Sequence, residues 1–176
     1  MGKLNVVGKA HEAGQGDAFN WFIYASSLSQ GAFAEWADQH GYAVPDFSRA
    51  IPARLPGYRL AFNVQSRFWG GAVASLAEDP DRAVEGLVLP LPGAAQGLAD
   101  HKEGAISGLY RPFDVSVAPL AGGPPVPATA YRASPDRQLP AEAPPSPRFL
   151  DALVRGAREA NLSAAYLAEL EALLAR

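Results

Sequence analysis

Clusters of proline and glycine divide this chain into short runs of aromatic and β-branched residues. The 176 residues include 16 prolines and 17 glycines, which gather in a few stretches instead of spreading evenly. The run Trp21–Tyr24 ends at the small residues Ala25-Ser26-Ser27 and is typical of a buried strand that stops at a tight turn. Repetition of this pattern predicts a sheet whose strands are joined by irregular loops.

Six such runs are expected to be strands. They are Trp21–Tyr24, Tyr58–Val64, Ala72–Leu76, Val84–Leu89, Tyr110–Ala118 and Val126–Ala133. The Pro56-Gly57 turn precedes the second run, and the turn-rich segment Glu78–Asp81 is expected to separate the third run from the fourth.

Segments with helical spacing lie between and after these runs. Phe33, Trp36, Ala37 and His40 recur at i, i+3, i+4 and i+7, and Gly41 is expected to end that helix. A shorter helical stretch, Ala94–Lys102, leads to Glu103.

The proline-rich segment Ser134–Pro145 is expected to be a surface loop, and Ser146-Pro147 resembles an N-cap followed by proline at the first helical position. The apolar faces of the last two helices consist of Phe149, Leu150, Leu153, Val154 and Ala157, and of Tyr166, Leu170, Leu173 and Leu174.

Together these segments predict an α+β fold, with a mixed, strongly curved or closed β-sheet (a small β-barrel) of five or more strands and surrounding helices. Residues 21–176 are expected to form a single domain, preceded by an N-terminal extension over residues 1–20. Because this extension carries charged residues and lacks an apolar core, it does not resemble a signal peptide. No window approaches the roughly 20 apolar residues of a membrane span, so the expected location is the cytoplasm.

Composition narrows the possible functions. The formal net charge is -3 and the 15 basic residues are scattered, so binding to nucleic acid or to an anionic membrane is disfavoured. The chain has no cysteine, which excludes disulfides, thiolate metal sites and a cysteine nucleophile. The three histidines, at positions 11, 40 and 101, have no metal-ligand spacing, and His40 falls on the apolar face of its helix. Neither a phosphate-binding glycine loop nor the Gly-x-Ser-x-Gly motif of serine hydrolases is present.

Two segments are candidates for chemistry. The turn at Tyr24–Leu28 presents consecutive backbone N–H groups, which can hold a carboxylate or a developing oxyanion. The alternative is a plain strand-to-helix turn capped by Ser27 or Ser29. Glu103 follows a helical stretch and precedes Gly104, and it would be an effective general base in a partly apolar site. The alternative for Glu103 is a solvated helix end.

Taken in order, these segments resemble the γ-glutamylcyclotransferase family, whose fold is called AIG2-like. Residues 22–28 have the sequence Phe-Ile-Tyr-Ala-Ser-Ser-Leu, similar to the family's strand ending in Tyr-Gly-Ser-Asn-Leu. Residues 69–74 resemble its Gly-Gly-Ile-Ala strand, and residues 85–88 its Gly-Val-Val strand. The most specific match is residues 103–110, Glu-Gly-Ala-Ile-Ser-Gly-Leu-Tyr, which resembles Glu-Gly-x-x-Ser-Gly-x-Tyr. The tail, from Ala143 to Leu162, resembles the final loop and helix pair of the animal branch.

The resemblance implies an enzyme that cyclises the γ-glutamyl group of a small γ-glutamyl amine, amino acid or peptide to 5-oxoproline and releases the amine. Glu103 would be the catalytic acid/base. The substrate would be bound by Tyr24, Ala25, Ser26, Ser27, Leu28 and Tyr110. The resemblance implies no metal and no organic cofactor, and the only implied partner is the γ-glutamyl substrate.

Two residues depart from the family pattern. Ala25 stands where the family usually has glycine, and a methyl group is costly there if the position needs a positive φ. Ser27 replaces an asparagine. Three hypotheses follow: a cyclotransferase of the family's usual kind, a relative acting on another γ-glutamylated metabolite, and a non-catalytic binding or interaction module. The sequence leaves open the leaving amine and the oligomeric state, a homodimer included.

Overall fold

The computed structural model describes residues 18–176. The expected extension over residues 1–20 therefore lies almost wholly outside the described residues, and the first strand begins at Ala18 instead of Trp21. The strands are β1 (Ala18–Ile23), β2 (Ile51–Ser66), β3 (Gly71–Pro92), β4 (Tyr110–Pro119) and β5 (Val126–Ala133). The helices are α1 (Gln30–His40), α2 (Gln96–Lys102), α3 (Pro147–Glu159) and α4 (Ala164–Leu174), with short 3-10 turns η1 (Ser26–Leu28), η2 (Phe47–Arg49), η3 (Gly93–Ala95) and η4 (Pro135–Arg137).

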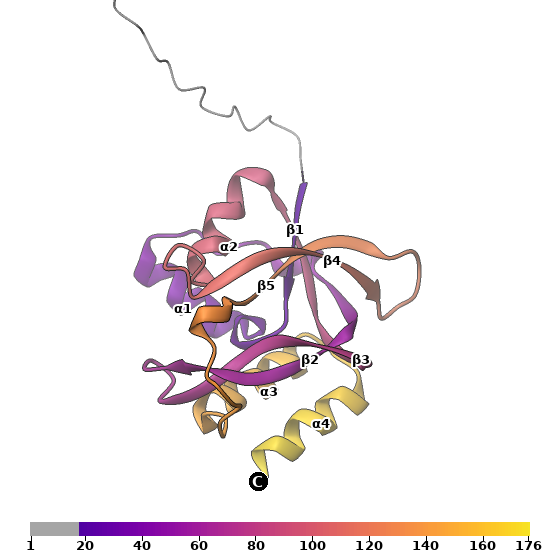
Figure 1. Cartoon of the computed structure of the whole chain (residues 1–176). Helices are drawn as coiled ribbons and strands as arrows, with labels where there is room; N and C mark the ends of the chain where they lie inside the picture. Colours follow the sequence, from indigo (N-terminus) through magenta and orange to yellow (C-terminus); the bar gives the residue numbers. More distant parts are fainter. Residues whose placement is uncertain (1–17) are drawn as a thin grey trace, which may run out of the picture.

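The strands close into a barrel in the order β1-β3-β2-β4-β5. The contact between β1 and β5, at Trp21 and Thr129, is parallel, and the other pairings are antiparallel. Helices α3 and α4 lie on the side of the β2–β3 hairpin, and α1 and α2 lie toward the opposite side (Figure 1). The prediction of a mixed, closed sheet with surrounding helices is confirmed.

The β2–β3 hairpin differs from the sequence-based prediction. The runs Ala72–Leu76 and Val84–Leu89 are two parts of the single 22-residue strand β3, and β2 begins before the Pro56-Gly57 pair instead of after it. Pro56 pairs with Ala83 and Tyr58 pairs with Glu78, so Gly57, at φ 82°, stands opposite residues 79–82. The turn-forming residues therefore make a bulge that bends a long hairpin, and they do not end its strands.

The barrel interior and the helices share one hydrophobic core. Trp21 is fully buried, and its ring lies 5.9 Å from that of Phe33 on α1 and 6.4 Å from that of Tyr131 on β5. The expected apolar face of α3 is buried along its whole length, whereas on α4 only Tyr166 and Leu170 are. This shared burial fixes the helices on the barrel.

Helix ends follow the sequence signals. Ser29 caps α1 by accepting from the N–H of Ala32, and Gly41 ends the helix in the left-handed conformation. Ser146 caps α3 in the same way, with Pro147 at the first helical position. His40, however, is exposed; its ring stacks on Trp36 at 4.5 Å without entering the core.

A buried carboxylate joins α4 to the barrel. Glu85, in β3, is 2% exposed and accepts hydrogen bonds from the N–H and the hydroxyl of Ser163, both at 2.8 Å, and from Arg54 at 2.7 Å. The adjacent Gly86 lies so close to β1 that an added Cβ would stand 2.1 Å from the carbonyl oxygen of Ile23. Glu85 and Gly86 therefore have structural roles. Glu85 binds the residue that caps α4, and Gly86 leaves room for the close approach of β1.

The proline-rich segment Ser134–Pro145 follows the β2 strand at the surface. Leu139 donates its N–H to the carbonyl of Asn63 at 2.7 Å, and Ala143 donates to Phe62 at 2.9 Å. These bonds fasten the segment to the barrel as a connector. Residues 18–176 contain no helix with the length and hydrophobicity needed to span a bilayer.

Candidate functional site

A cavity of about 200 Å³ brings the two candidate segments together. The turn after β1 contributes Tyr24, Ala25, Ser26 and Ser27, and the end of α2 contributes residues 101–104. The rest of the lining consists of Val64, Ser66, Trp69, Val73, Ala74, Leu109, Tyr110 and Phe149. Of the residues expected to form the site, Leu28 alone does not line this cavity.

The turn after β1 explains the place of Leu28. The N–H of Leu28 donates to the carbonyl of Ala25 at 3.0 Å, and that of Ser29 donates to Ser26 at 3.2 Å. The Leu28 side chain is buried in the core. Ser26 and Ser27 are the first residues of η1, and the first N–H groups of a helical turn have no acceptor within that turn. Ser29 does cap the following helix, so the segment is a capped turn that also forms the wall of a cavity.

Ala25 does not need a left-handed backbone in this turn. Its φ is -123° and its ψ is -144°, so its φ lies outside the positive range that favours glycine. The glycine that the family usually has here is therefore not needed for a positive φ. The methyl group of Ala25 lies at the cavity wall, where it alters the shape of the cavity and not the backbone.

Glu103 is the residue that ends α2. Its N–H donates to the carbonyl of Ala99 at 2.9 Å, and Gly104 follows at φ 72°. The residue is half-buried; burial raises the pKa of its carboxyl to about 7, although the neighbouring Lys102 ammonium lowers it. The alternative expectation for Glu103 was a solvated helix end. The residue does lie at a helix end, but it is half-buried. A carboxyl with this pKa is present in both protonation states near neutrality, as an acid/base group must be.

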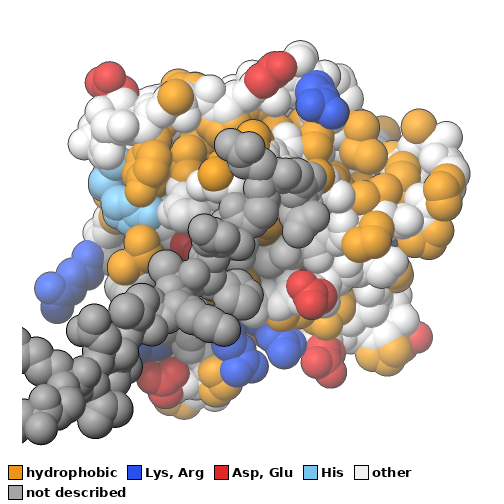
Figure 2. All heavy atoms as spheres, turned by 90° about the horizontal axis from the view of Figure 1, so that it is seen from above, with side chains coloured by type: hydrophobic (Ala, Val, Ile, Leu, Met, Phe, Trp, Pro, Cys, Tyr) orange, Lys and Arg blue, Asp and Glu red, His pale blue; other side chains and the backbone are white. Residues whose placement is uncertain are grey.

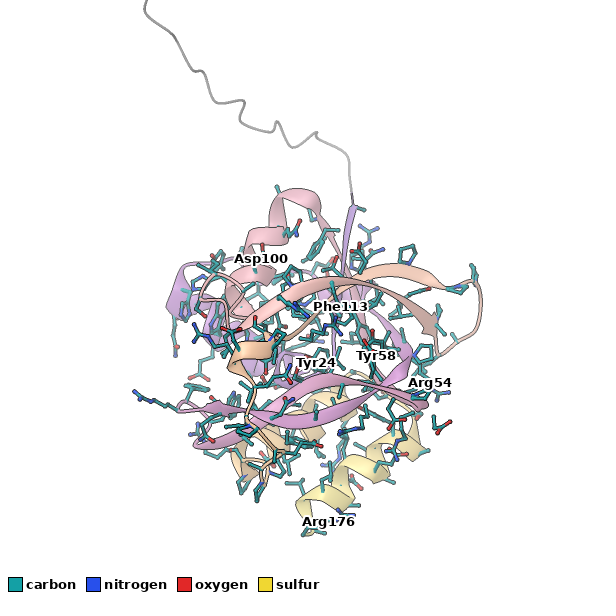
Figure 3. The ribbon with its side chains drawn as sticks, viewed as in Figure 1. Tyr24, Arg54, Tyr58, Asp100, Phe113 and Arg176 are labelled. Atoms are coloured by element: carbon teal, nitrogen blue, oxygen red, sulfur yellow. The ribbon has the colours of Figure 1, made fainter. Side chains whose placement is uncertain are left out.

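Two tyrosines line the cavity, one in the turn after β1 and one at the start of β4. Tyr24 donates to the carbonyl oxygen of Tyr131 at 2.6 Å, and Tyr110 donates to that of Ala74 at 2.8 Å. Burial raises the pKa of Tyr24 and of Tyr110, and the nearby Glu103 raises both further. The two phenols are therefore neutral and already committed as donors. In Figure 3, Tyr24 lies between the β2–β3 hairpin and the strands β4 and β5, with Asp100 above it on α2.

Two residues next to Glu103 were not among the expected site residues. His101 lines the cavity, and its Nδ1 lies 2.9 Å from the Tyr42 hydroxyl. The Nζ of Lys102 lies 5.3 Å from the Trp36 ring centroid, and burial lowers the pKa of this ammonium group. His101 also lies edge-on to His40, with 5.2 Å between the rings. In Figure 2, which shows the molecule from above, histidine side chains lie together at the left edge. In the sequence, the only sign that His101 and Lys102 belong to the site is their position next to Glu103.

A metal site is not evident in the part of the chain that the structure describes. Across residues 18–176, no three histidine, aspartate or glutamate side chains gather as ligands. Among the residues that line the cavity, Glu103 carries a carboxyl that can exchange a proton near neutrality, and Ser26 and Ser27 belong to the turn after β1.

Known proteins resemble this chain in sequence and in fold. Residues 83–170 match the AIG2-like family, and this range includes Glu103 and Tyr110. The chain is 30% identical to the γ-glutamylcyclotransferase of Homo sapiens over 161 residues, which cover 89% of this chain and 79% of the human protein. It is 28% identical to that of Bos taurus over 162 residues, covering 90% and 80%. A solved structure of a γ-glutamyl cyclotransferase superposes with a TM-score of 0.72 at 26% identity, covering 89% of this chain and 88% of that one.

Proposed function

Because this chain belongs to the AIG2-like family and is an enzyme of the γ-glutamylcyclotransferase type, we propose that it converts a small γ-glutamyl compound to 5-oxoproline and a free amine. The observation that carries the proposal is Glu103, whose pKa of about 7 belongs to a carboxyl in the same cavity as the Ala25–Ser27 turn. If Glu103 were a solvated surface acid, or if the turn only connected β1 to α1, there would be no reason for the two to line the same cavity.

The reaction is an intramolecular aminolysis. The α-amine of the glutamyl group attacks its own γ-carbonyl carbon, and the new C–N bond closes a five-membered ring. The C–N bond to the leaving amine then breaks. Because both reacting groups belong to one molecule, holding the folded conformer supplies much of the rate enhancement. A cavity of only about 200 Å³ favours that compact conformer.

Glu103 moves the proton in this scheme. The substrate amine is protonated near neutrality and cannot attack until a base removes its proton. The ionised carboxylate of Glu103 accepts this proton and then, as the acid, gives it to the departing amine. A pKa of about 7 suits both steps, whereas an ordinary glutamate would be a poor acid at this pH.

The turn after β1 binds the glutamyl group. The N–H groups of Ser26 and Ser27 are free to donate to a substrate carboxylate or to the oxyanion that forms on the γ-carbonyl. Tyr24 and Tyr110 shape the wall and stay neutral, because burial raises the pKa of both phenols. Leu28 supports this turn from the core and does not contact the substrate.

The test is the release of 5-oxoproline from a panel of γ-glutamyl compounds. The wild-type chain should turn over at least one of them, and both Glu103→Gln and Glu103→Ala should lose at least 100-fold in kcat, the usual scale of general acid–base catalysis. Glu169→Gln is the control, because Glu169 is an exposed residue of α4 that pairs with Arg82.

Turnover that persists in both Glu103 variants would contradict the proposed role of Glu103. Binding of γ-glutamyl compounds without release of 5-oxoproline would instead indicate a non-catalytic binding module on this scaffold.

A further inference from the structure

A larger hollow of about 810 Å³ opens beside the cavity. The two share Ser26, Ser66, Trp69 and Lys102 as lining residues, so they are compartments of one site. Small-molecule sites usually enclose roughly 300–1,000 Å³, and the inner cavity falls below that range. A γ-glutamyl compound with its glutamyl group in the inner cavity must therefore place its other half in the hollow.

One wall of the hollow is aromatic and exposed. Phe68, in the turn between β2 and β3, is 71% exposed, and Trp69 follows it at an angle of 86° with 5.1 Å between the rings. Ligand pockets are lined predominantly by hydrophobic and aromatic side chains. The ring face of Phe68 is an area on which a flat apolar group can pack.

Arg148 holds this wall in place. Its guanidinium carbon lies 5.7 Å from the Phe68 ring centroid and 5.6 Å from that of Trp69, and its Nη1 donates to the carbonyl of Phe68 at 3.1 Å. Arg148 belongs to the first turn of α3, so the β2–β3 turn is fixed to that helix. The aromatic surface is thus ordered before a ligand arrives, which lowers the entropic cost of binding.

The charges in the hollow argue against a cationic occupant. Asp151 and Arg155 pair with each other at 3.1 Å, and the other charged residues that line the hollow are Lys102, Arg148 and Glu35, two positive charges against one negative. The lining also includes Trp36 with His40 stacked on it. A further positive charge would meet an excess of like charge, whereas a neutral or anionic aromatic group would not.

We propose that this hollow is the subsite for the leaving amine and that it selects aromatic amines, including those that carry a carboxylate, over small or polycationic ones. The proposal rests on the proposed function, because it assigns the second half of the same substrate. The predicted determinant of selectivity is Phe68, and Arg148 positions it.

The test compares γ-glutamylphenylalanine, γ-glutamylalanine and γ-glutamylputrescine by kcat/KM for release of 5-oxoproline. Phenylalanine is expected as the preferred leaving amine. Phe68→Ala should lower the phenylalanine-to-alanine ratio about three- to tenfold, the scale of one aromatic contact. Leu174→Ala removes an exposed apolar side chain at the far end of α4 and should keep the wild-type ratio.

A second measurement separates this inference from the proposed function. Titration calorimetry of γ-glutamylphenylalanine and γ-glutamylalanine on the Glu103→Gln chain reports binding without chemistry. An aromatic preference in binding that Phe68→Ala reduces would support the subsite even if no compound were turned over, and the proposed function alone would then be wrong. Turnover with equal efficiency for phenylalanine and alanine, or a ratio that Phe68→Ala leaves as it was, would overturn the subsite and leave the proposed function intact.

Discussion

The hydroxyl of Tyr131 donates a hydrogen bond to the carboxylate of Asp100, with 2.7 Å between Oη and Oδ1. This contact ties β5 to α2, the helix that ends at Glu103. The backbone carbonyl of the same tyrosine accepts from Tyr24. Tyr131 therefore connects the turn after β1 with the helix that carries the proposed base.

Tyr131→Phe tests this connection. Hydrogen bonds to charged groups contribute about 2 kcal/mol, so the free energy of unfolding should fall by about that amount in a denaturant titration. Because the end of α2 would be less firmly held, kcat for 5-oxoproline release should also fall. Tyr58→Phe is the control: the Tyr58 ring packs on Phe113, its hydroxyl bonds to none of residues 18–176, and both labelled side chains appear in Figure 3. An equal loss in the two variants would contradict the connection.

The pH dependence of the reaction should follow Glu103. The proposed base must be ionised to accept a proton, and burial raises its pKa to about 7. We expect kcat/KM to rise with pH through a midpoint near 7, where an unperturbed glutamate would give about 4.5. A profile of initial rates at constant ionic strength measures this midpoint. An acidic limb centred near 4 would show that the carboxyl is not desolvated in the working enzyme.

The same raised pKa makes Glu103 a cost to stability. The folded state binds this proton more tightly than the unfolded chain does, so the cost is absent below the unfolded pKa of 4.5, grows as the pH rises, and is complete above about 7. A shift of that size corresponds to about 3 kcal/mol as an order of magnitude. Glu103→Gln should therefore stabilise the chain at pH 8 while abolishing turnover, and the gain should shrink toward pH 4.5. Thermal unfolding of both chains at the two pH values measures this. A variant that is less stable at pH 8 would contradict it.

The fold was predictable where local signals agree with the tertiary structure. The N-caps at Ser29 and Ser146 and the apolar face of α3 are set by nearby residues, and each is confirmed. The β2–β3 hairpin was not, because the turn-forming residues near Pro56 and Pro80 predict chain reversal locally. The strands continue through this bulge because β2 and β3 pair with each other on both sides of it. The local sequence of one strand does not show that pairing.

At the candidate site too, some features follow from local sequence and others from contacts between distant residues. The resemblance of residues 103–110 to the family motif predicts an acid/base role for Glu103. The raised pKa of its carboxyl is caused by burial, and the cavity walls come from distant parts of the chain, such as Trp69 and Phe149. Leu28 was assigned to the substrate because it belongs to the same short motif as Ser27. Its burial depends on a helix more than a hundred residues later in the chain, and no local pattern shows that contact.

That contact is the close approach of α3 to the turn after β1. A Cβ added at Gly156 would stand 2.6 Å from the Cβ of Leu28 and 2.6 Å from the backbone nitrogen of Ser29, so Gly156→Ala must push the helix and the turn apart. Overpacking of this kind costs about 1–3 kcal/mol. Because the displaced segment carries Ser26 and Ser27, KM for the γ-glutamyl compound should rise as well.

Gly31→Ala is the matched control for Gly156→Ala. Gly31 is also helical, and nothing lies within 4 Å of the Cβ that it would gain. Alanine is favoured over glycine by about 1 kcal/mol in a helix interior and by less in the first turn, where Gly31 lies, so this variant should be at least as stable as the wild type, with an unaltered KM. Urea titration and steady-state kinetics on the three chains compare them directly. If Gly156→Ala were as stable as Gly31→Ala, the turn would not be held by α3, and the binding geometry proposed for Ser26 and Ser27 would lose its support.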